Sequence, residues 1–164
     1  MSYHPISLHS EIAPNLFMGG TDDADVIQNP IARHIRRTDM PFDSIVTMYA
    51  WAQPADWNIQ EFRYGVTDAS IAQIDLARLK QAVEFGYNRW LSGDRVLVRC
   101  QAGLNRSGLV TALILMSTGL DAGTAIEEIR KKRAEVALFN NEYVTWLINN
   151  GAEFLAASSF AKIA

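Results

Sequence analysis

Residues 95–110 read RVLVRCQAGLNRSGLV, and three different local patterns follow one another within them. Residues 96–98 form a short apolar run rich in valine, which is typical of a buried strand and too brief for a helix. Residues 108–116 read GLVTALILM and have the length and composition of a buried helix. The sequence therefore predicts a strand, a sharp turn and a helix, with residues 100–107 in the turn.

A turn of this kind can bind an anion. Where a strand turns sharply into a helix, several backbone N–H groups point at one spot and the helix dipole adds positive potential there. Cys100 lies at the start of the turn and Arg106 near its end, so the same potential favours the thiolate form of the cysteine. A lone cysteine is more often a small buried apolar residue. That alternative does not account for Gly103 in the middle of the turn or for Ser107 directly after the arginine.

The Cys-x5-Arg-Ser spacing in this strand–loop–helix setting is similar to the signature of the cysteine-based protein tyrosine phosphatase superfamily. Residues 12–19 have the form Ile-x-Pro-x-Leu-Phe-x-Gly, which resembles the opening of its small dual-specificity phosphatase branch. We expect a single catalytic domain over residues 1–164, with the resemblance clearest over residues 10–150. The resemblance implies an α/β fold with a mostly parallel central sheet flanked by helices.

Composition limits the possible partners and compartment. A chain of 164 residues has the size of one domain, and its single cysteine excludes an intramolecular disulfide and favours a reducing cytoplasm. A net charge of −3 and a pI near 5.6 argue against stable binding to nucleic acid. The longest apolar run is too short to span a membrane, and residues 1–15 contain no apolar core of a signal peptide. We therefore expect neither a nucleic-acid partner nor a membrane.

The rest of the chain alternates strand and helix patterns, as an α/β fold requires. Asp75 is a plausible N-cap of a helix that ends before residues 92–94. Two tryptophans that look exposed, Trp51 and Trp57, lie in a loop between two strand patterns. Strands are expected as a pair within residues 5–19 and at 42–49, 60–66 and 96–98, and helices at 31–37, 76–91, 108–116 and 122–133.

The C-terminal third reads as helical. Asp121 is expected to cap the helix that carries Ala125, Ile126 and Ile129 on its buried face. Residues 130–133, Arg-Lys-Lys-Arg, are expected to form its solvated basic end, which the helix dipole favours. The following helix should begin after residue 140 or 141, bury Val144, Leu147 and Ile148, and end at residues 149–151. Residues 152–164 then read as a weak, separate helix.

The resemblance implies a role for each residue of the signature. Cys100 corresponds to the nucleophile, and the backbone of the loop to the phosphate-binding site together with the Arg106 guanidinium. Ser107 corresponds to the residue that donates to the cysteine sulfur and helps it to leave. The phosphate-binding residues implied are Gln101, Ala102, Gly103, Leu104, Asn105 and Arg106.

The general acid must be an upstream carboxylate on a loop. Asp68 lies in the loop ahead of the long helix, where the family places its acid. Asp75 is the rival and reads as an N-cap, while Asp94 lies in the turn before the strand, on the wrong side of it. Asn140 and Asn141 could approach the site, but helix capping explains them adequately.

The chain departs from the family at residue 99, where Arg99 replaces the usual histidine. Because side chains alternate across a strand, Arg99 should point away from the face that Cys100 presents to phosphate. It should then meet carboxylates or carbonyls if that face is covered, or extend to water if the face is open.

The resemblance implies a phosphatase that hydrolyses phosphate monoesters through a phosphocysteine intermediate. The neutral loop residues favour singly phosphorylated groups, such as phosphotyrosine on proteins, and leave phosphoserine and phosphothreonine open. The run Gly-Leu-Asn-Arg-Ser-Gly also resembles RNA 5′-triphosphatases. Phosphoinositide phosphatases and a pseudophosphatase that only binds phosphate are further alternatives. This mechanism requires no metal or other cofactor, and His4, His9 and His34 show no metal-binding spacing.

Overall fold

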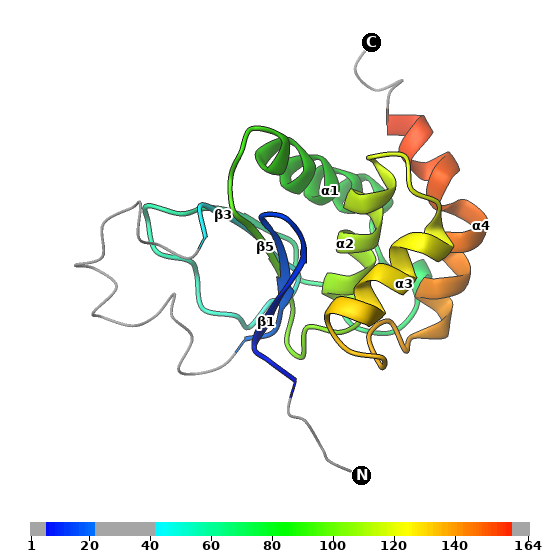
Figure 1. Cartoon of the computed structure of the whole chain (residues 1–164), viewed down its shortest axis with the longest axis horizontal. Helices are drawn as coiled ribbons and strands as arrows, with labels where there is room; N and C mark the ends of the chain where they lie inside the picture. Colours follow the sequence, from blue (N-terminus) through cyan, green and yellow to red (C-terminus); the bar gives the residue numbers. More distant parts are fainter. Residues whose placement is uncertain (1–5, 22–41, 159–164) are drawn as a thin grey trace.

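The computed structural model describes residues 6–21 and 42–158, so the helix expected at residues 31–37 lies outside the described chain. A five-stranded sheet carries helices on one of its faces (Figure 1). The strands are β1 (His9–Ala13), β2 (Leu16–Gly19), β3 (Ser44–Thr47), β4 (Gln60–Arg63) and β5 (Val96–Arg99). The helices are the 3-10 turn η4 (Ile71–Gln73), α1 (Leu76–Leu91), α2 (Arg106–Met116), α3 (Ala122–Lys132) and α4 (Asn141–Ser158).

The strand from the signature stretch, β5, lies at the centre of the sheet. The spatial order is β1-β2-β5-β3-β4, in which only the β1–β2 pair is antiparallel. Val98 of β5 lies opposite Met18 of β2 on one side and Val46 of β3 on the other. The predicted α/β fold with a mostly parallel sheet is confirmed. The parallel strands all end at one edge, and the loops that leave that edge can meet there.

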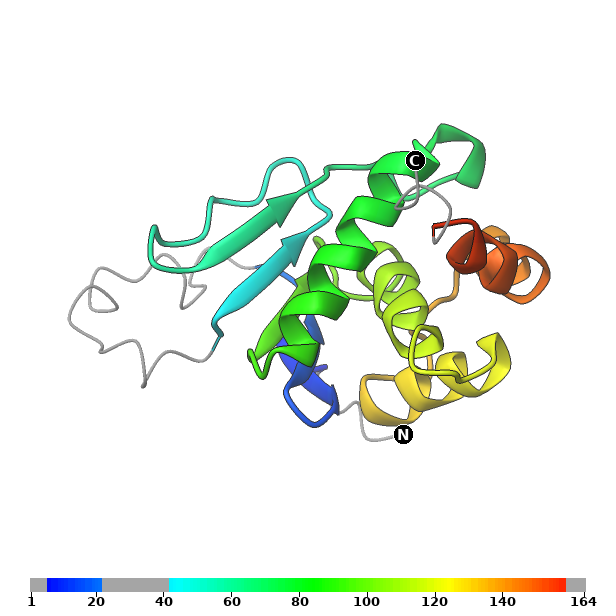
Figure 2. The same ribbon diagram turned by 90° about the horizontal axis from the view of Figure 1, so that it is seen from above.

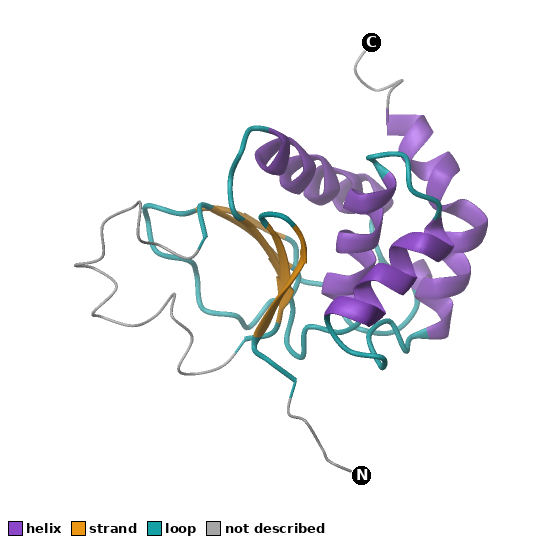
Figure 3. Cartoon of the chain, in the orientation of Figure 1, coloured by secondary structure: helices purple, strands orange, loops and turns teal. Residues whose placement is uncertain are grey.

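The two faces of the sheet differ in what covers them. Val96 and Val98 of β5 pack into the main core with the helices, whereas Leu97 packs with Ile45 and Phe42 on the opposite face. All four α-helices lie on the first face (Figures 2 and 3). Every residue of α2 is buried, because the other helices surround it and the sheet lies beneath it. Within the described ranges, loop segments rather than helices lie on the second face (Figure 3).

Helix α1 begins as the sequence predicts. Asp75 Oδ1 accepts hydrogen bonds from the backbone N–H groups of Ala77 at 3.0 Å and Arg78 at 3.3 Å, and this satisfies two donors of the first turn. Leu79, Ala82 and Val83 are buried as expected. Leu76 is 41% exposed, so the apolar face of the helix begins one turn later than its spacing predicted.

Helix α4 contradicts the prediction that a helix ends at residues 149–151. It continues without a break to residue 158, so no separate helix begins at residue 152. A Cβ atom added at Gly151 would lie 2.9 Å from Met116 Cε, so the glycine lets α4 approach α2 closely. The Phe154 ring then packs edge-on against Trp146 at a centroid distance of 5.2 Å. Packing against α2 thus keeps residues 149–151 helical, although an Asn-Asn-Gly run usually ends a helix.

Two neighbouring residues of α4 test this packing. Leu147 is fully buried, whereas Ile148 is 59% exposed, although the sequence placed both inside. We expect Leu147→Ala to lower the free energy of unfolding by about 2–5 kcal/mol, because it leaves a cavity in the core. Ile148→Ala should change it by less than about 0.5 kcal/mol, as for most surface changes. Urea denaturation of both variants measures the difference, and equal losses would show that the assigned face is wrong.

Candidate active site

The loop of residues 100–106 connects β5 to α2 at the carboxyl edge of the sheet. Its first residue, Cys100, is 2% exposed, and its backbone N–H donates to Gly19 O on β2 at 3.2 Å. Gly103 has a φ of 71°, and a Cβ atom there would lie 2.3 Å from the Gly19 carbonyl carbon. The loop therefore needs glycine at residue 103, both for its backbone conformation and for its close approach to β2.

The carbonyl groups of this loop are bound from the outside. Because a trans peptide group points its N–H away from its C=O, outward carbonyls turn the N–H groups of the following residues towards the inside of the loop. Several inward N–H groups create a concave site for an anion. The hydrogen bonds are Thr21 N to Gln101 O (3.0 Å), Arg133 Nη2 to Ala102 O (3.4 Å), Arg133 Nε to Gly103 O (3.0 Å) and Leu138 N to Leu104 O (3.1 Å).

Cys100 faces the first turn of α2. Its Sγ is hydrogen-bonded to the buried hydroxyl of Ser107 at 3.3 Å. The side chain of the N-cap residue, Asn105, makes no capping hydrogen bond, so it leaves the positive end of the helix dipole directed at the loop. A thiolate at Cys100 would be stabilised by this dipole and by the Ser107 hydroxyl as a donor.

Arg106 extends from the same turn towards two neighbouring loops. Its Nη1 donates to Val66 O at 2.9 Å, and its guanidinium lies 5.4 Å from the centroid of the Tyr49 ring. Its Nε is buried and has no hydrogen-bond partner within the described part of the chain. A buried donor without a partner costs free energy, and a bound oxyanion could satisfy it.

Asp68 is tied to the loop through two asparagine side chains. Asn105 Nδ2 donates to Asp68 Oδ2 at 2.8 Å, and Asn140 Nδ2 donates to Asp68 Oδ1 at 2.9 Å and to Ala69 O at 2.9 Å. The Asn140 backbone N–H in turn donates to Asn105 Oδ1 at 3.0 Å. The structure thus brings Asp68 next to the loop that carries Cys100 and Arg106.

The same network corrects the interpretation of Asn140. Its Oδ1 accepts from the backbone N–H groups of Glu142 and Tyr143, so it does cap α4. Capping alone was expected to explain this residue, but its amide group also holds Asp68. The rival carboxylate Asp75 caps α1, and Asp94 binds Ser44 and Arg89. Neither hydrogen-bonds to the loop of residues 100–106.

The predicted solvated basic end of α3 is confirmed for Lys131 and Lys132, which are exposed, but is wrong for Arg133. Arg133 is 8% exposed and donates to the carbonyls of Ala102, Gly103 and Ser7. Burial lowers the pKa of the Arg133 guanidinium below its usual value, and the negative charge of Cys100 opposes that shift. The sequence did contain a signal, because residues 126, 129 and 133 follow the spacing of one helical face whose first two members are apolar. Arg130, at the same end, donates to the carbonyls of Ala137 and Leu138.

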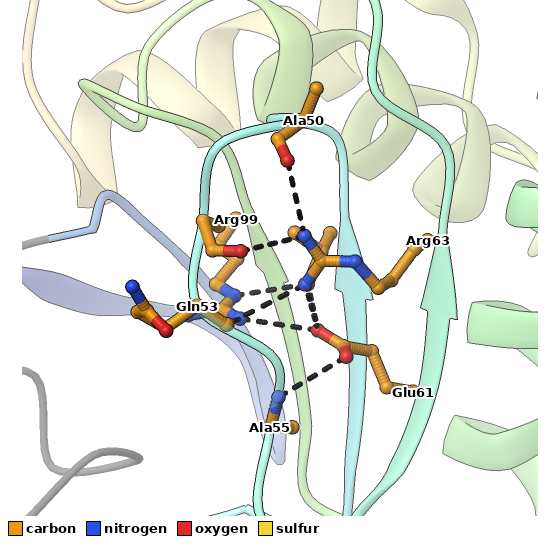
Figure 4. Close-up of polar contacts among 8 residues, drawn as sticks. Ala50, Gln53, Ala55, Glu61, Arg63 and Arg99 are labelled. Carbon is orange, nitrogen blue, oxygen red and sulfur yellow. Dashed lines mark hydrogen bonds and ion pairs between the residues drawn. The ribbon is translucent and has the colours of Figure 1, made fainter.

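Arg99 points to the face opposite Cys100, as strand alternation predicted. It is fully buried, which excludes the alternative in which it extends to water. Figure 4 shows its guanidinium beside Glu61. Its Nη2 donates to Glu61 Oε2 at 3.1 Å and to Gln53 O at 2.7 Å, and its Nε donates to Thr47 Oγ1 at 3.0 Å. Arg99 therefore supports the strand and the loop beneath it and does not face the anion site.

No group of three or more His, Cys, Asp or Glu side chains in the described ranges is placed to hold a metal ion. His4 and His34 lie outside those ranges. Among the described helices, none is long and apolar enough to cross a bilayer.

Comparison with known proteins identifies a matching family model and similar folds. A family model described as "Dual specificity phosphatase, catalytic domain" matches residues 38–152. No curated protein matches the chain in sequence. The crystal structure of human DUSP28 is 24% identical, with a TM-score of 0.72 over 91% of this chain and 99% of that chain.

Two further crystal structures have the same fold. Tk-PTP in its active form is 21% identical, with a TM-score of 0.70 over 89% of this chain and 97% of that chain. PTPMT1 in complex with PI(5)P is 18% identical, with a TM-score of 0.69 over 93% of this chain and 99% of that chain. At these identities the likeness shows the fold alone.

Tyr143 provides a pH-dependent test of the loop that carries Asp68. Its hydroxyl donates to Thr67 O at 3.3 Å, and burial, aided by the charge of Asp68, raises the pKa of Tyr143 from 10.0 to about 12. A raised pKa means that the fold favours the neutral phenol, so this stability is complete below pH ~10 and is lost as the pH rises towards about 12. We expect the free energy of unfolding to fall more steeply across this window in the wild type than in Tyr143→Phe. Urea denaturation at several pH values measures the free energy of unfolding of both proteins. Equal slopes against pH would contradict a raised pKa of Tyr143 in the fold.

Proposed function

Because the chain belongs to the dual specificity phosphatase catalytic-domain family of cysteine-based phosphatases, we propose that it hydrolyses phosphate monoesters on proteins through a phosphocysteine intermediate. Phosphotyrosine is the proposed substrate, and phosphoserine and phosphothreonine are further candidates. The observation that supports this most directly is the hydrogen bond from Asn105 to Asp68, which joins the candidate acid to the loop of Cys100 and Arg106. Nucleophile, anion site and acid are then parts of one connected structure.

The first proposed step transfers the phosphoryl group to the enzyme. The Cys100 thiolate attacks phosphorus, the P–O bond to the leaving group breaks, and the leaving oxygen takes a proton from Asp68. The inward N–H groups of the loop and the Arg106 guanidinium bind the three phosphoryl oxygens while charge shifts onto them. The dephosphorylated hydroxyl group of the substrate is then released.

The second proposed step returns the enzyme to its initial form. Asp68, now a carboxylate, accepts a proton from the attacking water, and the P–S bond breaks as inorganic phosphate forms. The leaving sulfur regains its negative charge. The Ser107 hydroxyl, at 3.3 Å from Sγ, donates a hydrogen bond that stabilises it.

The environment of Asn105 weighs against the RNA 5′-triphosphatase alternative. The asparagine before the arginine was the basis of that resemblance, but here it is 3% exposed and its amide group binds Asp68 and Asn140. It is therefore not available to a second or third phosphate. A phosphoinositide substrate would also bring several phosphates to a loop whose variable residues are all neutral. The presence of Cys100, Arg106 and Asp68 weighs against a pseudophosphatase.

The test compares phosphate esters with different leaving groups. Asp68→Asn should slow hydrolysis of a phosphotyrosyl peptide by about 100- to 10,000-fold, because a general acid contributes this much. It should slow an ester with a very acidic leaving group much less, because that group departs without a proton. Steady-state kcat for both substrates, with vanadate inhibition of the wild type, measures this.

Asp75→Asn is the matched control, because it removes a loop carboxylate that caps α1 and lies outside the site network. It should leave the stability nearly unchanged, because asparagine caps a helix about as well as aspartate, and it should keep the same dependence on the leaving group. An equal loss for both esters in Asp68→Asn would assign Asp68 a structural role. A well-folded wild type that hydrolyses neither ester would exclude the proposed phosphatase activity.

A further inference from the structure

A tight turn at residues 49–52 carries an exposed tryptophan. Ala52 N donates to Tyr49 O at 3.2 Å, which closes the turn, and Trp51 lies within it with 83% of its surface exposed. Nothing in the described core requires this side chain. Tryptophan is enriched where proteins bind partners, because its ring offers a large apolar area at a small cost in conformational entropy.

The turn lies beside the candidate active site. Its first residue, Tyr49, faces the Arg106 guanidinium at 5.4 Å. Its second, Ala50, lies against Gly65, where an added Cβ would be 2.5 Å from the Ala50 Cβ. The segment after Gly65 then binds Arg106 through Val66 O and continues to Asp68. The turn, the Asp68 loop and the loop of residues 100–106 therefore meet around Arg106.

The backbone on both sides of Trp51 is held in place. Arg63 on β4 donates to Ala50 O at 3.4 Å and to Ala52 O at 2.6 Å, as Figure 4 shows for the first of these carbonyls. Arg63 is itself paired with Glu61 at 3.1 Å, and Glu61 is paired with Arg99. The cluster of Arg63, Glu61 and Arg99, on the face of the sheet opposite the helices, thus holds the turn in one conformation. A turn that is already ordered loses less conformational entropy when it binds a partner.

We propose that Trp51 is a substrate-contacting residue that binds an apolar side chain next to the phosphorylated residue of a protein substrate. This inference rests on the proposed phosphatase function and names the part of the substrate that is recognised. With the phosphate at Arg106, Tyr49 lies beside that guanidinium, and Trp51 follows two residues later in the same turn. Trp51 is then reached by neighbouring residues of an extended segment, which advances about 3.3 Å per residue.

A polypeptide suits this surface better than RNA. A net charge of −3 gives the chain no general attraction for a polyanion such as RNA. An exposed tryptophan on a loop is typical of surfaces that bind protein segments. Bases also stack on tryptophan, so RNA is included as an outcome of the test.

The chain offers a matched control in Trp57. It lies in the same loop and is 93% exposed. The chain there is returning to the opposite edge of the sheet, because Gln60 N donates to Asp43 O and Gln60 pairs with Ser44 at the start of β3. The four residues of β4 place the two edges about 13 Å apart. Trp57 is therefore as exposed as Trp51 but distant from Arg106.

The test measures binding and turnover separately. In a Cys100→Ser background, Trp51→Ala should raise the Kd of a phosphotyrosyl peptide with leucine on both sides about tenfold, a typical effect of losing one aromatic contact. Trp51→Phe should recover most of this affinity, and Trp57→Ala should leave it within twofold. With Cys100 present, Trp51→Ala should lower kcat/KM for this peptide about tenfold relative to p-nitrophenyl phosphate, mainly through KM.

The outcomes separate this inference from the proposed function. A wild type that hydrolyses no phosphate ester, but binds the peptide in a Trp51-dependent manner, would overturn the activity and support the contact. Equal affinity for the leucine-flanked peptide in Trp51→Ala and Trp57→Ala would overturn the contact. Trp51-dependent binding of 5′-phosphorylated single-stranded RNA, without binding of the phosphopeptide, would also overturn it.

Discussion

One buried guanidinium, that of Arg133, holds the carbonyls of Ala102 and Gly103 and fixes the shape of the loop between β5 and α2. Because these carbonyls are held outside, the adjoining N–H groups face the inside of the loop, where they create positive potential beside Cys100. Arg133 adds a positive charge to the same part of the molecule, because its guanidinium donates to the carbonyls two and three residues after Cys100. A flat or mobile loop could neither stabilise a thiolate nor bind three phosphoryl oxygens at once.

Side chains alternate along β5, so the neighbouring residues Arg99 and Cys100 face opposite sides of the sheet and have different roles. Cys100 faces the helices and the anion site, while Arg99 faces the opposite side and joins the charged cluster with Glu61 and Arg63. Burying these charges costs free energy unless each has partners. Glu61 is paired with both arginines, and the carbonyls of Gln53, Ala50 and Ala52 accept further hydrogen bonds from them. The same hydrogen bonds hold the loop after β3 beneath the sheet, so the strand that presents the nucleophile also orders the rim of the site.

Local patterns in the sequence predicted much of this arrangement, and long-range contacts account for the rest. The Val-Leu-Val run, the Asp75 cap and the alternation at Arg99 are properties of neighbouring residues, so periodicity and capping rules predicted them. Arg133 was misplaced because a basic helix end usually lies in solvent, and its acceptors come from segments distant in sequence, the loop of residues 100–106 and Ser7. The break predicted at Gly151 was wrong for a similar reason, since the glycine serves contact with Met116. The second role of Asn140 depends on Asp68, 72 residues away in sequence, which no local pattern indicates.

The covalent step is the central claim, and rapid acid quenching tests it most directly. The wild type is mixed with excess phosphotyrosyl peptide, quenched within the first turnover, digested and analysed by mass spectrometry. We predict one added phosphoryl group on the peptide that contains Cys100, and none in Cys100→Ser treated in the same way. Turnover with no phosphoryl group on Cys100 at any quench time, or with one on another residue, would contradict it.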